Sequence, residues 1–250
     1  MITVASLALA AVFFCGEARA GAWPVPVGET LTILKYERAD SNEAFDLDGE
    51  RYGAVERTDE VASLYAEHGL TERLTLQGKV SWARGEEGGA AYDGRGPLEL
   101  GLRYVFMKRR RAVISLYLGG VVAGEGRNAG YADPGEGGTD VEARVLAGRS
   151  FTAARRPAFV EAQVARLVRQ ELPDETRLDL TAGVEPAPDW LLLVQTYAGW
   201  TDSDPQWIKL EASVVRRFGD WRLQAGWRTS IAGKASPAEA GPVLGIWRRF

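Results

Sequence analysis

Apolar and polar residues alternate along most of this chain, in segments of about ten residues separated by turn-forming residues. Between residues 208 and 214 every even position is apolar, whereas Lys209, Glu211 and Ser213 occupy the odd positions. A period of two residues is the signature of a β-strand with two unlike faces. The pattern predicts strands at 30–38, 59–68, 72–83, 97–108, 112–124, 138–150, 157–168, 175–185, 189–201, 206–218, 220–231 and 241–250.

The connections between these segments also alternate in length. Long connections rich in Gly, Asp and Glu follow the first, third, fifth and eleventh segments, at 39–58, 84–96, 125–137 and 232–240. Short ones, such as 69–71, 186–188 and Gly219, follow the even-numbered segments. Long loops on one side and tight turns on the other are typical of an outer-membrane barrel. The connections 169–174 and 202–205 are shorter than this rule predicts.

Aromatic residues gather near the ends of the segments, mostly on the apolar face. Trp190 and Trp200 lie ten residues apart, at the two ends of one segment. With a rise of ~3.3 Å per residue and a strand tilt of ~40°, they are separated by about 25 Å along the membrane normal, which is the height of the lipid-facing apolar band. A strand in lipid must pair every backbone group, so its sheet must close. The expected interface aromatics are Trp82, Phe106, Trp190, Trp200, Phe218, Trp221 and Phe250.

The C-terminal segment carries a resemblance to a known class of proteins. Leu244, Ile246 and the terminal Phe250 resemble the insertion signal of Gram-negative outer-membrane β-barrels, with Arg248 where the family usually has an aromatic residue. The resemblance implies an all-β fold, a closed antiparallel transmembrane β-barrel of about 12 strands over residues 30–250, in the cell outer membrane. It also implies contact with outer-membrane lipids and lipopolysaccharide, and with the barrel-assembly machinery through the C-terminal strand.

A second, shorter stretch has its own resemblance. Residues 97–104, PLELGLRY, are similar to strands of small barrels associated with transport of aromatic compounds in the phenol meta-pathway. That match spans eight residues.

The N-terminus reads as an export signal. Residues 2–15 are almost entirely apolar, and Ala18-Arg19-Ala20 forms a cleavage site, so residues 1–20 are expected to be a signal peptide. No Lys or Arg precedes the apolar run, which leaves the true translation start open. Cleavage removes Cys15, the only cysteine, and with it any disulfide or thiolate site. Residues 21–29 are expected at the periplasmic end, either as a tail or as a partial plug of the lumen.

Composition agrees with this interpretation once the two faces are separated. The mean hydropathy of −0.18 and the 26% of charged residues are values typical of a soluble protein. In this chain they are averages over an expected apolar outer face and an expected charged inner face. Beyond Gly21 no run approaches the ~18 apolar residues of a transmembrane helix. A net charge of −4 argues against nucleic-acid binding.

The polar face of the strands is the candidate functional surface. The expected lumen-lining residues are Lys79, Glu99, Arg103, Glu142, Arg144, Glu161, Arg177, Asp179, Lys209, Glu211, Arg222 and Arg228. Such residues either form a salt-bridged plug or line a water-filled constriction, and the alternation allows both. The sequence favours a narrow channel for passive passage of small polar or ionic solutes. The alternative is a non-conducting barrel that serves as a surface anchor or as a component of surface-polymer export.

No residue pattern indicates catalysis, a metal site or a cofactor. His68 is the only histidine and falls beside a short turn, so a role at the interface or in the turn is expected rather than a role as general base. Asp46-Leu47-Asp48-Gly49 superficially resembles a calcium loop but lacks the later bidentate Glu. Arg216 and Arg248 lie on apolar faces two residues from strand ends, where long side chains can reach the interface.

Overall fold

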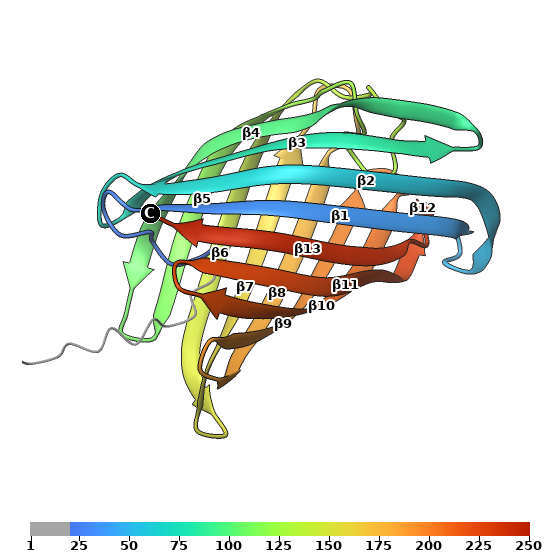
Figure 1. Ribbon diagram of the computed structural model, residues 1–250. Helices are drawn as coiled ribbons and strands as arrows, with labels where there is room; N and C mark the ends of the chain where they lie inside the picture. Colours follow the sequence, from blue (N-terminus) through green and yellow to red (C-terminus); the bar gives the residue numbers. More distant parts are fainter. Residues whose placement is uncertain (1–20) are drawn as a thin grey trace, which may run out of the picture.

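The computed structural model describes residues 21–250, which form a closed antiparallel β-barrel (Figure 1). Twelve long strands and the two-residue strand β12 make up its wall in this part of the chain. Their bounds are β1 Thr30–Phe45, β2 Arg51–Gly69, β3 Leu74–Glu87, β4 Ala90–Lys108, β5 Ala112–Val122, β6 Thr139–Ala153, β7 Arg156–Val168, β8 Glu175–Ala187, β9 Trp190–Thr201, β10 Gln206–Phe218, β11 Trp221–Lys234, β12 Ser236–Pro237 and β13 Ala240–Arg249. The predicted signal peptide, residues 1–20, lies outside the described residues.

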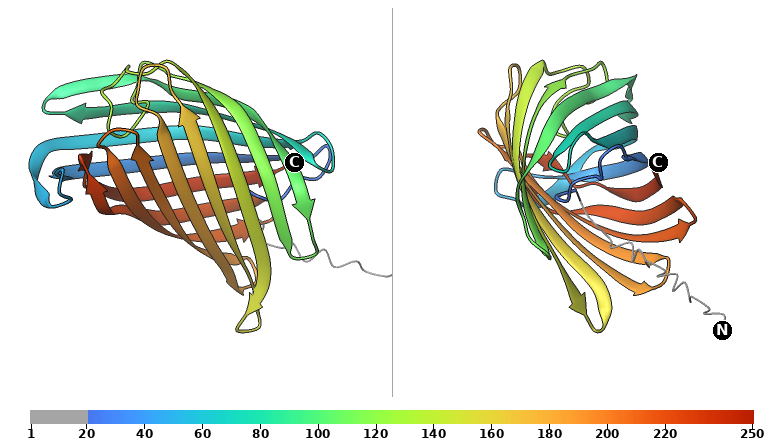
Figure 2. Two further views of the ribbon diagram at one scale, coloured as in Figure 1. Left: turned by 180° about the vertical axis from the view of Figure 1, so that it is seen from behind. Right: turned by 90° about the vertical axis from the view of Figure 1, so that its left-hand side faces the viewer.

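The barrel closes because β1 pairs on both sides. Leu34 of β1 faces Leu64 of β2 and Ile246 of β13, both antiparallel, and the other long strands pair with their neighbours in chain order. Figure 2 shows the tilted strands of the wall from behind and from one end. Closure leaves no free edge, which is what a strand in hydrocarbon needs.

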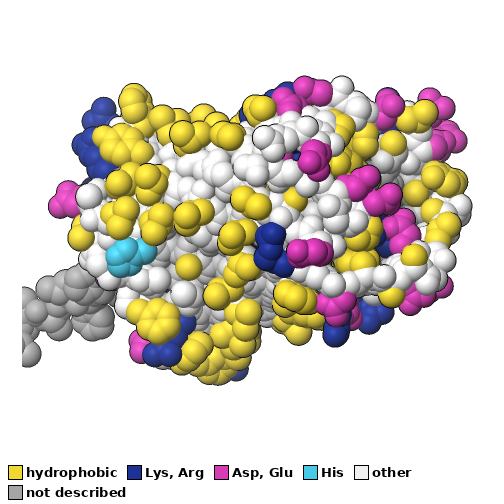
Figure 3. Space-filling view, turned by 90° about the horizontal axis from the view of Figure 1, so that it is seen from above, with side chains coloured by type: hydrophobic (Ala, Val, Ile, Leu, Met, Phe, Trp, Pro, Cys, Tyr) yellow, Lys and Arg dark blue, Asp and Glu magenta, His cyan; other side chains and the backbone are white. Residues whose placement is uncertain are grey.

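The outside of the wall is apolar and the inside polar. Leu100 is 60% exposed on the outer face, whereas Arg103, three residues further along β4, is fully buried on the inner face. Acidic side chains gather at the end of the molecule that carries the β1–β2 hairpin, away from the C-terminus (Figure 3). The described residues contain no helix long and apolar enough to cross a membrane.

The predicted aromatic residues all lie on this outer surface. Their exposed fractions range from 38% for Trp190 to 66% for Phe106. Trp190 opens β9 and Trp200 stands next to its last residue, so the two indoles bracket one strand. The predicted members are Trp82, Phe106, Trp190, Trp200, Phe218, Trp221 and Phe250.

Two of the predicted long loops are wrong. Residues 39–58 and 84–96 continue the strands on either side, so β1 and β2 are joined only by 46–50, and β3 and β4 only by Gly88 and Gly89. Both glycines have positive φ, +60° and +85°, which the tight turn requires. The alternation predicted shorter strands because both faces become polar beyond the apolar belt, while the backbone ladder continues.

Candidate functional site: the barrel lumen

The N-terminal segment 21–29 runs inside the barrel. Ala22 is fully buried; its backbone N–H donates to Glu161 Oε2 at 2.6 Å, and its carbonyl accepts from Ser115 Oγ at 2.7 Å. Arg103 Nη2 donates to the carbonyl of Trp23 at 2.8 Å. These bonds replace the water that the extended backbone would otherwise need. The segment therefore occupies part of the lumen instead of hanging below the barrel as a tail.

One side of the wall is shaped to receive this segment. Trp23 packs edge-on against Phe159, with ring centres 6.4 Å apart, and its indole lies over Gly148. A Cβ at Gly148 would stand 2.5 Å from the indole, so no larger residue fits. Arg103 is itself held by Glu67, at 2.6 Å. The segment is thus fixed to strands β4 to β7.

The other side of the lumen stays open. A cavity of about 520 Å³ lies toward the β1–β2 hairpin, and a second of about 290 Å³ lies toward the short turns. The two cavities share a rim made of Gly21, Ile33, Lys35, Tyr65, Gln163 and Tyr197. They meet beside the N-terminal segment, since Gly21 belongs to the shared rim.

Cationic side chains dominate the lining of the larger cavity. Seven cations line it, against two carboxylates, Glu37 and Asp179. The cations come from seven different strands, one from each, so the charge surrounds the space. They are Lys35, Lys79, Arg103, Arg144, Arg177, Lys209 and Arg228.

Most of the matching carboxylates lie behind these cations. Arg228 Nη2 lies 2.6 Å from Glu211 Oε2, yet the Arg228 side chain is 25% exposed and that of Glu211 is 0% exposed. The same order holds for Arg177 and its partner Glu175. The Arg177 side chain is 33% exposed, and that of Glu175 is 0% exposed. A buried carboxylate orients the guanidinium and leaves its outer face toward the cavity. A solute in the lumen therefore meets positive charge first.

The outer mouth is narrowed by the connection between β5 and β6. Asn128 fixes this loop: its amide nitrogen donates to the carbonyls of Gly124 and Glu136, at 2.7 and 2.9 Å. Arg127 ties it to the wall through Asp59 at 3.2 Å and Glu87 at 2.7 Å. The loop thus lies over the cavity, and we call this β5–β6 connection the lip.

Tyr131 connects this loop to the opposite side of the barrel. Its ring lies 5.7 Å from that of Trp207, and its hydroxyl accepts from Arg169 Nη1 at 3.0 Å. Burial, with the nearby carboxylate of Glu175, raises the pKa of Tyr131 to about 12. The phenol therefore keeps its proton, and with it the ability to donate a hydrogen bond, to a higher pH than an exposed tyrosine.

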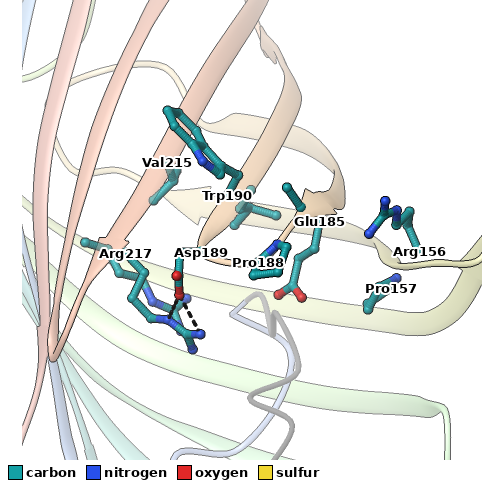
Figure 4. A pocket seen from close by; sticks show the side chains of 11 residues that line it. Arg156, Pro157, Glu185, Pro188, Asp189, Trp190, Val215 and Arg217 are labelled. Atoms are coloured by element: carbon teal, nitrogen blue, oxygen red, sulfur yellow. Dashed lines mark hydrogen bonds and ion pairs between the residues drawn. The ribbon is translucent and has the colours of Figure 1, made fainter.

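The inner mouth has a shallower cavity of about 320 Å³ (Figure 4). Arg217 pairs with Asp189 at 2.7 Å there, and the indole of Trp190 projects away from that pair. Arg222 lines both this cavity and the lower lumen. The short-turn end is therefore lined by charges of both signs, Arg156, Arg217 and Arg222 with Glu185 and Asp189.

All twelve residues expected to line the lumen point inward, but they differ in what they face. Nine line one of the two lumen cavities: Lys79, Arg103, Arg144, Glu161, Arg177, Asp179, Lys209, Arg222 and Arg228. Glu99, Glu142 and Glu211 line neither and lie behind cations.

The sequence missed part of the lining. Lys35 and Glu37 of β1 and Tyr65 of β2 line the larger cavity. In the first two segments the alternation is ambiguous, and either face of 59–68 could be the apolar one. The signal that resolves them is the pairing of Leu34 with Leu64 on the outer face.

The remaining candidates lie away from the lumen. His68 Nδ1 is 2.9 Å from Thr30 Oγ1, at the short-turn end of β2. Asp46 accepts from the backbone N–H groups of Asp48 and Glu50, both at 2.9 Å, and so closes its own turn. Within residues 21–250 no group of three His, Cys, Asp or Glu side chains could hold a metal.

Comparison with solved structures places the fold. The chain is similar to the COG4313 outer membrane channel from Pseudomonas putida F1, at 16% identity and a TM-score of 0.74, covering 94% of this chain and 100% of that one. It is also similar to the KdgM porin, at 10% identity and a TM-score of 0.56, covering 87% of this chain and 99% of that one. The NanC porin is similar at 8% identity and a TM-score of 0.55, covering 87% of this chain and 98% of that one. No family model and no curated protein sequence matches. The chain has the fold of an outer-membrane β-barrel.

Proposed function

We propose that this protein is a narrow passive channel for small solutes in the bacterial outer membrane. The observation that carries the proposal is the pair of lumen cavities that meet beside the N-terminal segment at Lys35, Tyr65 and Tyr197. The apolar exterior supports residence in a bilayer, where lipids and lipopolysaccharide surround the wall. The barrel-assembly machinery would recognise the C-terminal strand. The known channels with this fold agree with that proposal.

The lining supports a preference for anions. Seven cations and two carboxylates face the larger cavity, and Glu175 and Glu211 lie behind guanidinium groups. In a narrow, partly desolvated space such a field raises the local concentration of anions. Organic carboxylates are therefore the expected solutes.

Aromatic rings in the same cavity support a narrower class. Tyr65, Tyr131, Tyr197 and Trp207 line it together with the cations. Rings beside guanidinium groups suit a flat anion such as an aromatic carboxylate. The resemblance of residues 97–104 to aromatic-compound transporters points the same way.

The channel itself is tested in planar bilayers with the purified full chain in potassium chloride. Discrete conductance steps are expected. Silence at all salts and voltages would contradict the channel and favour the non-conducting barrel, an anchor or an export component. In that case deletion of the gene should remove a surface polymer without changing solute uptake.

Ion preference is tested by the reversal potential across a potassium chloride gradient. The native channel should favour chloride, and Lys79→Gln with Arg177→Gln should reduce that preference. Arg84→Gln is the matched control, since Arg84 is 63% exposed and pairs with Glu60 outside the lumen. A cation-selective channel would contradict the anion preference and leave the channel standing. Replacing chloride by benzoate or acetate then tests the aromatic class, which predicts the larger block by benzoate.

We propose no catalytic role for His68, because its partner Thr30 is a hydroxyl on the neighbouring strand and no acid completes a relay in the described residues.

A further inference from the structure

Two arginines stand on the outer, lipid-facing side of the barrel. Arg216 of β10 and Arg248 of β13 share the end of the wall that carries the short turns. Most other cations in the strands point inward or lie beyond the apolar belt. A cation in this position needs a partner, because the surroundings are apolar.

Each of the two guanidinium groups is enclosed by two aromatic rings. The guanidinium carbon of Arg216 lies 4.9 Å from the ring centre of Trp190 and 4.7 Å from that of Phe218. The guanidinium carbon of Arg248 lies 4.5 Å from the ring centre of Trp221 and 4.4 Å from that of Phe250. The register joins the two groups into one surface, because Trp221 faces both Phe218 and Arg248. We call Trp190, Arg216, Phe218, Trp221, Arg248 and Phe250 the interface patch.

The patch lacks a carboxylate. Neither Arg216 nor Arg248 forms an ion pair with a described residue, and Arg248 Nε has no hydrogen-bond partner there. The next residue along each strand behaves differently: Arg217 pairs with Asp189 at 2.7 Å, and Arg249 lies 3.9 Å from Glu29. Rings hold the outer arginines in place but neutralise no charge. Arg216 is exposed and Arg248 is partly exposed, so an external anion can reach these two uncompensated charges, although Arg248 Nε is itself buried.

We propose that the interface patch binds the phosphate of an anionic phospholipid in the inner leaflet. The short turns of such barrels face the periplasm, so this end meets phospholipid rather than lipopolysaccharide. A planar guanidinium matches a phosphodiester in shape and charge. The aromatic rings sit at headgroup level and pack on the upper acyl chain. The inference rests on the membrane residence proposed above and not on conduction.

The test is lipid binding to the full-length protein in detergent, read by native mass spectrometry. Phosphatidylglycerol should bind in preference to phosphatidylcholine, and added salt should weaken that preference. Each of Arg216→Gln and Arg248→Gln should weaken phosphatidylglycerol binding about fivefold, the effect of one charge near such a surface. Arg217→Gln is the matched control and should leave binding unchanged.

Three results would overturn the proposal. One is equal binding of the two lipids by the native protein, which is measured even where a variant fails to fold. Another is an equal loss in Arg217→Gln, which would indicate a diffuse basic rim. The third is displacement of the lipid by an excess of inorganic phosphate, which would make the patch a free-phosphate site. If the protein shows no conductance in bilayers but binds phosphatidylglycerol in preference to phosphatidylcholine, the channel proposal fails and the lipid-binding proposal stands.

Discussion

Arg103 donates from its guanidinium to the backbone carbonyl of Trp23, 2.8 Å away, although the two residues are 80 positions apart in the chain. The arginine has no contact with solvent and is held in turn by Glu67. A strand of the wall thereby fixes the segment that narrows the lumen. We expect the width of the proposed solute path to depend on this contact.

Gly148→Val is expected to displace the N-terminal segment and raise the single-channel conductance. The new side chain would occupy the space of the Trp23 indole, which lies 2.5 Å from a Cβ at this position. The measurement is conductance in bilayers. Gly120→Ala is the control, because its Cβ meets nothing nearer than 3.9 Å. Unchanged conductance in Gly148→Val would show that the segment does not limit flow.

Asn128→Ala is expected to loosen the lip at the outer mouth and make the current noisier. The substitution removes the amide that donates to the Gly124 and Glu136 carbonyls and leaves those acceptors unpaired, at a cost of about 1 to 3 kcal/mol. The readouts are current fluctuation and protease sensitivity within 123–138. Equal noise and equal protection in the variant would mean that other contacts, such as Arg127 with Asp59, suffice to hold the loop.

Glu211→Gln is expected to destabilise the barrel strongly. This carboxylate is fully buried and contacts Lys35, Arg228 and Gln224, so its neutral replacement leaves Glu37 as the one described carboxylate that still pairs with both cations. Breaking such a buried pair costs about 3 to 5 kcal/mol. The unfolding temperature of the detergent-solubilised protein should fall. Asp204→Asn removes an exposed pair with Lys234 and should have little effect; similar losses in both variants would refute this account.

His68→Gln is expected to leave conductance and selectivity unchanged. The ring contacts Thr30 near the short turns and lines neither lumen cavity. Glutamine keeps a polar group at the same height. The same bilayer recordings that measure the native channel provide the comparison, and a large loss of any activity would reopen the question of catalysis.

Closure into a barrel was inferred from the loop lengths, the aromatic residues at strand ends and the C-terminal resemblance. The alternation by itself determined most of the strands and their inner and outer faces. It could do so because each wall residue faces either lipid or lumen, and a period of two records that choice directly. The lipid-facing aromatics Trp190 and Trp200 and the inward Arg177 and Arg228 follow from the same rule. The pattern failed where this contrast ends, in the strand extensions beyond the apolar belt and in the ambiguous face of β2.

Only the tertiary structure decided what fills the barrel. The side of the lumen taken by Trp23, the lip formed around Asn128 and the order of Arg228 in front of Glu211 depend on contacts between residues far apart in the chain. Alternation assigns a residue to the interior but not to a depth within it. Whether a charge lines the path or lies behind another charge is set by side-chain packing across the lumen, and that order produces the cationic surface.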